Sequence, residues 1–243
     1  TLNNSNHARH EVIAARYLNR NPDLLVPTAM QNISDHGSNA RVYPINRNLR
    51  VEMLTEFGEF TSACGMTQYW GGAFPPEFNG VSFVNEPVHN LVHRDVLRDS
   101  GSTFIASRAR DGVEFLASTD PWFRPVNLTV GPDGALYLLD YYREVIEHPE
   151  WTSTSVQTSQ NLYNGADKGR IYRILPDSSP FPPARNLRLS QASDEELVHS
   201  LENPNVWWRR TAQRLLVDRQ SDASVSLLKN LFRQSNSALG RLH

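Results

Sequence analysis

The chain of 243 residues is 39% hydrophobic and 21% charged, which is enough apolar material for a folded core and too much for a disordered chain. Its 24 Lys and Arg residues nearly balance 26 Asp and Glu residues, and the net charge of −2 gives no electrostatic reason to expect nucleic acid as a partner. No apolar run approaches the ~18 residues of a membrane-spanning helix. The single cysteine, Cys64, excludes an internal disulfide and a CxxCH haem-attachment motif.

Residues 1–175 are rich in β-branched and aromatic runs that Gly, Pro, Asn and Asp interrupt. Runs of this kind predict four short strands within the ranges 60–70, 81–84, 91–97 and 103–106. The stretch GGAFPPEFNG, which disfavours regular structure, separates the first two runs. We therefore expect one antiparallel unit of four strands in this part of the chain.

The next unit carries the clearest hairpin signal of the sequence. The runs 125–130 (PVNLTV) and 135–140 (ALYLLD) suit strands, and the second is apolar enough to be buried. Between them, the turn GPDG combines a proline that presets φ with a glycine that accepts a positive φ. After a loop rich in Ser, Thr and Asn, residues 169–175 (GRIYRIL) predict a further strand.

The spacing of these strands favours a β-propeller, in which each blade holds four antiparallel strands. At about 40–50 residues per blade, residues 1–175 provide for about three to four blades, too few to close a ring. An ordinary antiparallel sandwich is the alternative for the same pattern. The open edges of such a partial propeller would make the isolated chain prone to self-association.

The pattern changes at residues 176–192, which are rich in Pro and Ser and predict a linker. Residues 193–243 then follow a helical period, with short amphipathic helices joined by brief turns. This arrangement favours the start of an α-solenoid of the HEAT type. The expected fold is therefore mainly β, a partial propeller, with a helical C-terminal part.

Helix starts are marked by their capping residues. Ser193 and Glu196 form a capping box, Asn203 and Pro204 indicate the N-cap and first residue of a second helix, and Ser221 opens a third. Four arginines of the second helix are expected on its solvated face: Arg209, Arg210, Arg214 and Arg219.

Propeller geometry also predicts where chemistry would gather. The loops that lead into each innermost strand, and those that join the second strand to the third, meet around the central channel. Six residues of these loops are expected to point at one funnel: Glu86, His89, Arg124, Asp140, Tyr142 and Arg143. Carboxylates, cations and an imidazole at a channel mouth suit an acid–base or cofactor-binding site.

Each candidate also has a purely structural interpretation. Arg124 can pair with Asp140 across the mouth of the hairpin, and Asp140 can form a turn. His89 can be a surface or hydrogen-bonded structural histidine, and Tyr142 a packing residue. The spacing of His89 and His93 matches a helical zinc pair, but an extended backbone separates such residues by about 13 Å.

Three long motifs resemble one known family. They are FTSACGMTQYWGGAFPPEFNGVSFVNEPVHNLVHRDVL, DPWFRPVNLTVGPDGALYLLDYYREVIEHPEW and LVHSLENPNVWWRRTAQRLLVDR. The chain resembles the PVC-type haem-binding CxxCH proteins, a family of membrane-bound dehydrogenases. These look like a six-bladed propeller related to glucose/sorbosone dehydrogenases, followed by HEAT repeats and a c-type cytochrome domain, and the third motif is similar to the first HEAT repeat.

The resemblance implies oxidation of a sugar, alcohol or aldehyde by pyrroloquinoline quinone (PQQ), with calcium as Lewis acid. Electrons would pass to haem c in a cytochrome domain absent from this chain. Carried onto this sequence, His89 becomes the candidate base, and Glu86 and Asp140 would orient it or hold the metal. The candidates for holding the quinone or substrate are Arg124, Tyr142 and Arg143.

The ends of the chain lead us to expect an internal piece of a longer protein. It opens on Thr1 without a signal-peptide pattern and stops at His243 without a helix terminator. The resemblance implies a periplasmic, secreted or membrane-associated location for the whole protein. We expect this piece to be inactive by itself, because CxxCH and several blades are missing.

Three functions remain open on the sequence. The first is part of a quinoprotein-type dehydrogenase, which acts on a sugar or alcohol and needs an electron-accepting cytochrome. The second is a non-catalytic propeller and HEAT module that binds a carbohydrate or a protein. The third is a calcium-dependent hydrolase of the lactonase type, since acidic propeller funnels also support metal-assisted hydrolysis. Fold alone does not decide among them.

Overall fold

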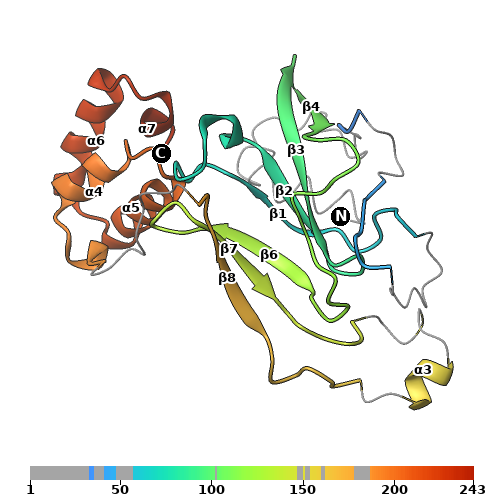
Figure 1. The fold of residues 1–243 in the computed structure, drawn as a ribbon. Coiled ribbons are helices and arrows are strands. Elements are labelled where there is room, and N and C mark those ends of the chain that lie inside the picture. Colours follow the sequence, from blue (N-terminus) through green and yellow to red (C-terminus); the bar gives the residue numbers. More distant parts are fainter. Residues whose placement is uncertain are drawn as a thin grey trace, which may run out of the picture.

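The computed structural model describes residues 33–35, 41–47, 57–101, 103–146, 150, 154–159, 162–177 and 187–243. Two antiparallel sheets are followed by four C-terminal helices (Figure 1). The described residues form no closed barrel. The expected succession of a β-rich part and a helical part is thus confirmed.

The first sheet contains the predicted four-strand unit and one short additional strand. Its strands are β1 (Cys64–Gln68), β2 (Ser82–Glu86), β3 (Leu91–Ser100), β4 (Thr103–Arg108) and β5 (Leu116–Ala117). The order is β1-β2-β3-β4, and β5 pairs with the first residues of β3. The long strand β3 therefore has β5 beside its start and β4 beside its end. A one-turn 3-10 helix, η1 (Pro76–Phe78), lies between β1 and β2.

The second sheet contains the predicted hairpin and the strand after it. Its strands are β6 (Pro125–Val130), β7 (Leu136–Asp140) and β8 (Arg170–Ile174), in the order β6-β7-β8. Gly134 ends the hairpin turn with a φ of 77°, and Asp133 Oδ1 accepts the N–H of Ala135 at 3.1 Å. Within the described residues, β8 pairs with β7 alone, so its outer edge carries no further strand there.

The two sheets pack face to face through β1 and β2 against β6. Thr67 Oγ1 donates to the carbonyl oxygen of Leu128 at 2.6 Å. Gly65 has a φ of 56°, and a Cβ there would lie only 2.5 Å from the carbonyl oxygen of Val126, so this approach requires glycine. The buried core draws on both sheets and includes Tyr69, Phe74, Phe83, Val92, Phe123, Leu128, Leu136 and Leu138.

The helical part begins at the predicted capping box. The helices are α4 (Asp194–Ser200), α5 (Val206–Arg219), α6 (Asp222–Gln234) and α7 (Ala238–Leu242), preceded by the 3-10 turn η3 (Leu189–Gln191). A separate short helix, α3 (Thr154–Ser159), lies far from them in Figure 1. Ser193 accepts the N–H of Glu196 while the Glu196 carboxylate accepts the N–H of Ser193, and Ser221 is the N-cap of α6, as predicted.

Two predictions about α5 are wrong. The helix starts at Val206 with Asn205 as its N-cap, two residues later than expected. The Asn203 side chain instead accepts the N–H of Asn205 at 2.9 Å, which holds a turn before the helix. Arg209 is 2% exposed rather than solvated, because its guanidinium donates to the carbonyl oxygens of Asn203 and Pro204 at 2.6 and 2.8 Å.

Helix α5 is docked on the turn of the β6–β7 hairpin. The N–H of Val206 donates to the carbonyl oxygen of Trp70 at 2.8 Å, and Val206 joins the core of the two sheets. Asn205 Nδ2 and Trp208 Nε1 donate to the carbonyl oxygens of Gly131 and Pro132, at 2.9 and 2.8 Å. Of the predicted linker, residues 178–186 lie outside the described residues.

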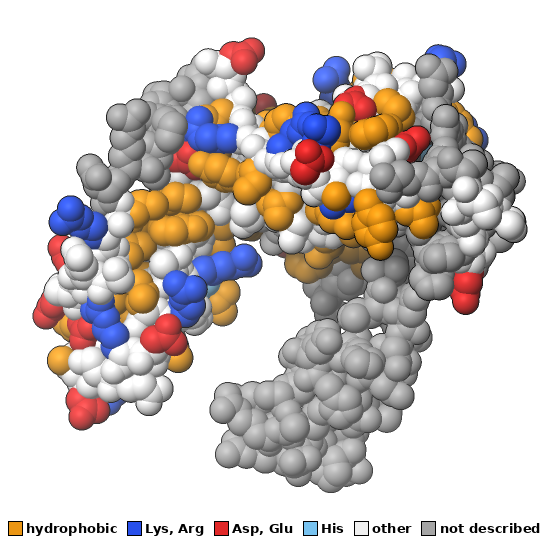
Figure 2. Space-filling model, turned by 90° about the horizontal axis from the view of Figure 1, so that it is seen from below, with side chains coloured by type: hydrophobic (Ala, Val, Ile, Leu, Met, Phe, Trp, Pro, Cys, Tyr) orange, Lys and Arg blue, Asp and Glu red, His pale blue; other side chains and the backbone are white. Residues whose placement is uncertain are grey.

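The surface is mixed in character. Figure 2 shows hydrophobic side chains in patches over both the helices and the sheets, with basic and acidic side chains between them. Ile171 of β8 is 67% exposed and Phe232 of α6 is 66% exposed. None of the described helices is long and apolar enough to cross a membrane.

Candidate functional site

Glu86 closes strand β2, and His89 lies in the tight turn that leads into β3. Pro87 interrupts the strand pairing because it has no N–H to donate. Asn90 ends the turn with a φ of 57°, a conformation that asparagine tolerates better than most residues. The Glu86 and His89 side chains are both 0% exposed. The turn thus brings the two predicted residues together, but encloses them.

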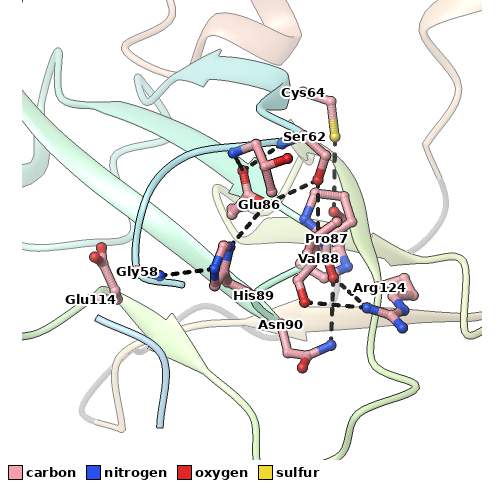
Figure 3. Close-up of polar contacts among 12 residues, drawn as sticks. Gly58, Ser62, Cys64, Glu86, Pro87, Val88, His89, Asn90, Glu114 and Arg124 are labelled. Atoms are coloured by element: carbon pink, nitrogen blue, oxygen red, sulfur yellow. Dashed lines mark hydrogen bonds and ion pairs between the residues drawn. The ribbon is translucent and has the colours of Figure 1, made fainter. Parts of the chain in front are cut away.

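The Glu86 carboxylate accepts three hydrogen bonds from the segment before β1 (Figure 3). Its Oε2 accepts the N–H groups of Thr61 and Ser62 at 3.1 and 2.9 Å, and its Oε1 accepts the hydroxyl of Ser62 at 2.9 Å. Hydrogen bonds to a charged group are about twice as strong as neutral ones. The carboxylate therefore fastens this segment to the end of β2.

The His89 ring has both nitrogens engaged. The N–H of Gly58 donates to Nε2 at 3.1 Å, so this nitrogen carries the lone pair. Nδ1 lies 3.4 Å from Oε1 of Glu86, which identifies it as the nitrogen that carries the proton. A general base needs a lone pair that can reach a substrate proton. In His89 that lone pair is occupied by the backbone.

Arg124 joins two loops through their carbonyl groups. Its guanidinium donates to Pro87 and Val88 of the β2–β3 turn at 3.0 and 3.3 Å. It also donates to Arg143 and Glu144, in the loop after β7, at 3.0 and 2.8 Å. These bonds connect the two sheets at one end.

Asp140 accepts backbone hydrogen bonds at the mouth of the hairpin. Its Oδ1 accepts the N–H of Arg124 at 2.8 Å and the N–H of Tyr142 at 2.9 Å. Asp140 therefore does bind Arg124, but it binds the backbone N–H of Arg124 rather than the guanidinium. Asp140 is 3% exposed, and its Oδ2 has no hydrogen-bond partner within the described part of the chain.

Tyr142 and Arg143 belong to the loop after β7. Tyr142 has a φ of 47°, and its hydroxyl donates to Oδ2 of Asp120 at 3.1 Å. The Arg170 guanidinium carbon lies 4.0 Å from the centroid of the Tyr142 ring. The Arg143 guanidinium donates to the carbonyl oxygens of Tyr141 and Tyr142 at 3.1 and 2.9 Å. Both side chains therefore stabilise the loop.

The residues do not fit the groups that the resemblance implies. Calcium takes about six to eight oxygen ligands, whereas both oxygens of the Glu86 carboxylate already accept hydrogen bonds, and Asp140 offers only its Oδ2 among the described residues. A quinone carboxylate needs guanidinium donors, whereas those of Arg124 and Arg143 point to backbone carbonyls. No group of three or more His, Cys, Asp or Glu side chains suited to a metal occurs among the described residues.

Asn90 is a central residue of this cluster that the sequence did not reveal. Its Nδ2 lies 2.6 Å from the carbonyl oxygen of Phe123 and 3.2 Å from that of Pro121, while its Oδ1 accepts from Asn46 at 3.2 Å. Its place after Pro87 in a turn was the available signal. A buried asparagine in a turn satisfies backbone groups that solvent cannot reach.

A second polar network surrounds His93 on strand β3. Nδ1 lies 2.7 Å from Glu114 and Nε2 lies 2.9 Å from Asp95. Glu114 is fully enclosed, and it also accepts the N–H of Tyr43 at 3.0 Å and a bond from Arg108 at 2.9 Å. His93 and His89 thus belong to different networks.

Protonation of this network differs from that of isolated side chains. Burial alone would lower the pKa of His93, but the hydrogen bonds to Asp95 and Glu114 outweigh it, and the pKa is raised. Burial would raise the pKa of Glu114, but the bonds from His93, Tyr43 and Arg108 lower it. The imidazole thus lies between two carboxylates, which favour its protonated form.

Cys64 lies half-buried at the start of β1, with Sγ 4.0 Å from the carbonyl oxygen of Pro125. Burial, and secondly the charge of Glu86, raises the pKa of this thiol to about 11. Because the thiolate is the nucleophile, Cys64 suits a structural position and not covalent catalysis.

Fold and site together define a class of protein: two packed antiparallel sheets with a helical unit docked on them. In this class, the polar side chains of the loops at one end of the sheets form hydrogen bonds with the protein's own backbone. A family model described as a domain of unknown function, DUF7133, matches residues 1–178. The chain therefore belongs to the DUF7133 family. No curated protein and no solved structure matches it.

Proposed function

We propose that this chain is a non-catalytic binding module: part of a β-propeller joined to HEAT-like helices, which offers its surface to a carbohydrate or protein ligand. The observation that carries the proposal is the closed state of the predicted site. Glu86 and His89 are 0% exposed, and the guanidinium of Arg124 donates to four carbonyl groups. A rigid, closed cluster of this kind suits a scaffold better than a reacting centre.

The arrangement of the elements supports the propeller and HEAT interpretations. Two successive antiparallel sheets pack face to face through one core, as neighbouring blades do. Helix α4 contacts both α5 and α6, and the three share a core of small and branched side chains, as in stacked repeats. Docking of α5 on the β6–β7 turn makes the two parts one platform.

Conversion of the cluster into an active site would require breaking its bonds. To expose the lone pair of His89, the N–H of Gly58 must lose its acceptor, which for a buried donor costs about 1–3 kcal/mol. To free Arg124 for a ligand, four carbonyl groups must lose a charged donor. A pre-organised catalytic site does not carry such costs.

The test is a comparison of redox turnover with cofactor-free binding. The whole chain, supplied with PQQ and calcium, is assayed for dye reduction with sugars and alcohols, and for binding of the same sugars without cofactor. We expect no dye reduction. Quinone-dependent turnover that disappears in a folded H89Q variant, but not in H199Q on the exposed face of α4, would overturn the proposal.

The dehydrogenase suggested by the resemblance stays a prediction for a longer protein. The same holds for PQQ, calcium, haem c, the electron-accepting cytochrome domain and a periplasmic or secreted location. The lactonase-type hydrolase also stays a prediction, and product analysis would identify it by addition of water to the substrate.

A further inference from the structure

A polar hollow lies on the outer part of the first sheet, away from the closed cluster. Its volume is about 310 Å³. It is lined by Asp35, Arg41, Tyr43, Ser107, Arg108 and Asp111, and we refer to it as the Tyr43 hollow. Small-ligand pockets in proteins start at about 300 Å³, so this hollow has room for one sugar ring.

The inner wall of the hollow is held rigid by the His93 network. The Arg108 guanidinium lies 4.8 Å from the centroid of the Tyr43 ring and donates to Glu114 at 2.9 Å. The N–H of Tyr43 donates to the same carboxylate at 3.0 Å. Glu114 is in turn 2.7 Å from His93. Ring and guanidinium are thus placed before any ligand arrives, which reduces the entropic cost of binding.

The outer wall carries polar groups of both signs. The Tyr43 hydroxyl donates to Oδ1 of Asp111 at 3.2 Å. Arg98 lies 3.7 Å from Asp35, which also accepts from the hydroxyl of Ser107. Within the described ranges, the Arg41 side chain has no ion-pair partner. The hollow therefore presents the Arg41 guanidinium beside carboxylates that can accept further hydrogen bonds.

The balance of charge selects the class of ligand. The lining holds two carboxylates and two guanidinium groups, and Arg108 is already paired with Glu114. An anion would approach Asp35 and Asp111, and a cation would approach Arg41, so neither is favoured. A sugar hydroxyl both donates and accepts without carrying charge, and it can use both kinds of group at once.

We propose that the Tyr43 hollow binds one ring of a neutral carbohydrate, with Arg41 as donor and Asp111 as acceptor to its hydroxyls. This inference rests on the proposed binding module and names its ligand. The Tyr43 ring and the Arg108 guanidinium position these groups and form the wall against which the sugar lies.

The experiment is ligand-observed NMR and calorimetry on the whole chain. The probes are glucose, galactose, mannose and cellobiose, with galacturonate as the anionic and glycine as the zwitterionic comparison. The variants are R41A, D111A and Y43F, and the matched control is R214A on the exposed side of α5. Because Y43F removes one hydroxyl only, it tests the hollow with little risk to folding.

We expect at least one neutral sugar to bind. R41A and D111A should each weaken its affinity about tenfold or more, because a hydrogen bond to a charged group contributes about that much to binding. R214A should bind as the wild type does. The inference is overturned if no neutral sugar binds, if galacturonate or glycine binds more tightly, or if binding survives in R41A, D111A and Y43F. If neither sugar binding nor dye reduction is found, the sugar site is rejected and the proposal of a protein-binding module remains. If quinone-dependent turnover is found, the proposal of a non-catalytic module is rejected as well.

Discussion

Replacement of Glu86 by alanine tests whether this carboxylate is structural. The change removes the acceptor of three hydrogen bonds, from Thr61 N–H, Ser62 N–H and the Ser62 hydroxyl, at a position that is 0% exposed. Each bond to a charged acceptor contributes about 1.5–3 kcal/mol, and neighbouring bonds are not additive, so we expect a loss of about 3–5 kcal/mol. Glu195→Ala, on the exposed face of α4, is the matched control.

The assay is urea unfolding followed by circular dichroism and tryptophan fluorescence. With a slope of about 1–3 kcal/mol per molar urea, E86A should lower the midpoint by about 1 M or more, and E195A should leave it unchanged. E86Q keeps one oxygen and should fall between the two. The direction of the shift in midpoint is decisive, because replacement of a catalytic residue often stabilises the fold. A midpoint for E86A or E86Q equal to or above the wild type would refute the structural role.

Three further predictions concern other parts of the molecule. The raised pKa of His93 means that its network stabilises the fold fully below about pH 6.5, and that this stabilisation is lost as pH rises through the raised pKa. The lowered pKa of Glu114 means that the stabilisation from this carboxylate is lost as pH falls below about 4.5. H93Q should therefore flatten the decline in the free energy of unfolding as pH rises, and an unchanged profile would contradict the network. Asn205→Ala removes the N-cap of α5 and its hydrogen bonds to the β6–β7 turn, so it should lower the free energy of unfolding by about 2–4 kcal/mol. Hydrogen exchange should become faster in α4 and α5 than in the sheets. An equal increase in all elements would show that the docking is unimportant. With a pKa of about 11, Cys64 should react with Ellman's reagent at pH 8 about 100-fold more slowly than in urea-unfolded chain, and equal rates would disprove its burial.

Local sequence patterns predicted most strands and the helix caps. The hairpin 125–140 follows from a Pro-Asp-Gly turn between two apolar runs, and α4 follows from the capping box at Ser193. Both signals depend on residues within a few positions of each other. The start of α5 was missed because Asn203 and Asn205 are both able caps, and the choice depends on where Val206 meets the core of the sheets.

The sequence predicted which residues of the candidate site lie together, but not which groups they bind. Glu86, His89, Arg124 and Asp140 do lie at one end of the two sheets, as the order of loops suggested. Most of their partners, however, are backbone N–H and C=O groups, up to 37 positions away in the chain. Every residue except proline carries both groups, so the sequence holds no signal for which of them a side chain will bind.

The sequence by itself determined the succession of strands, turns and helices, because φ preferences and hydrophobic period act over a few residues. Only the tertiary structure decided which polar residues are enclosed. Packing of β1 and β2 on β6 brings distant loops together and removes water from them, and the buried backbone groups then require the side chains of Glu86, His89, Asn90 and Arg124 as partners. On the outer part of the first sheet, groups around Tyr43 instead line a hollow, for which we propose a sugar ligand.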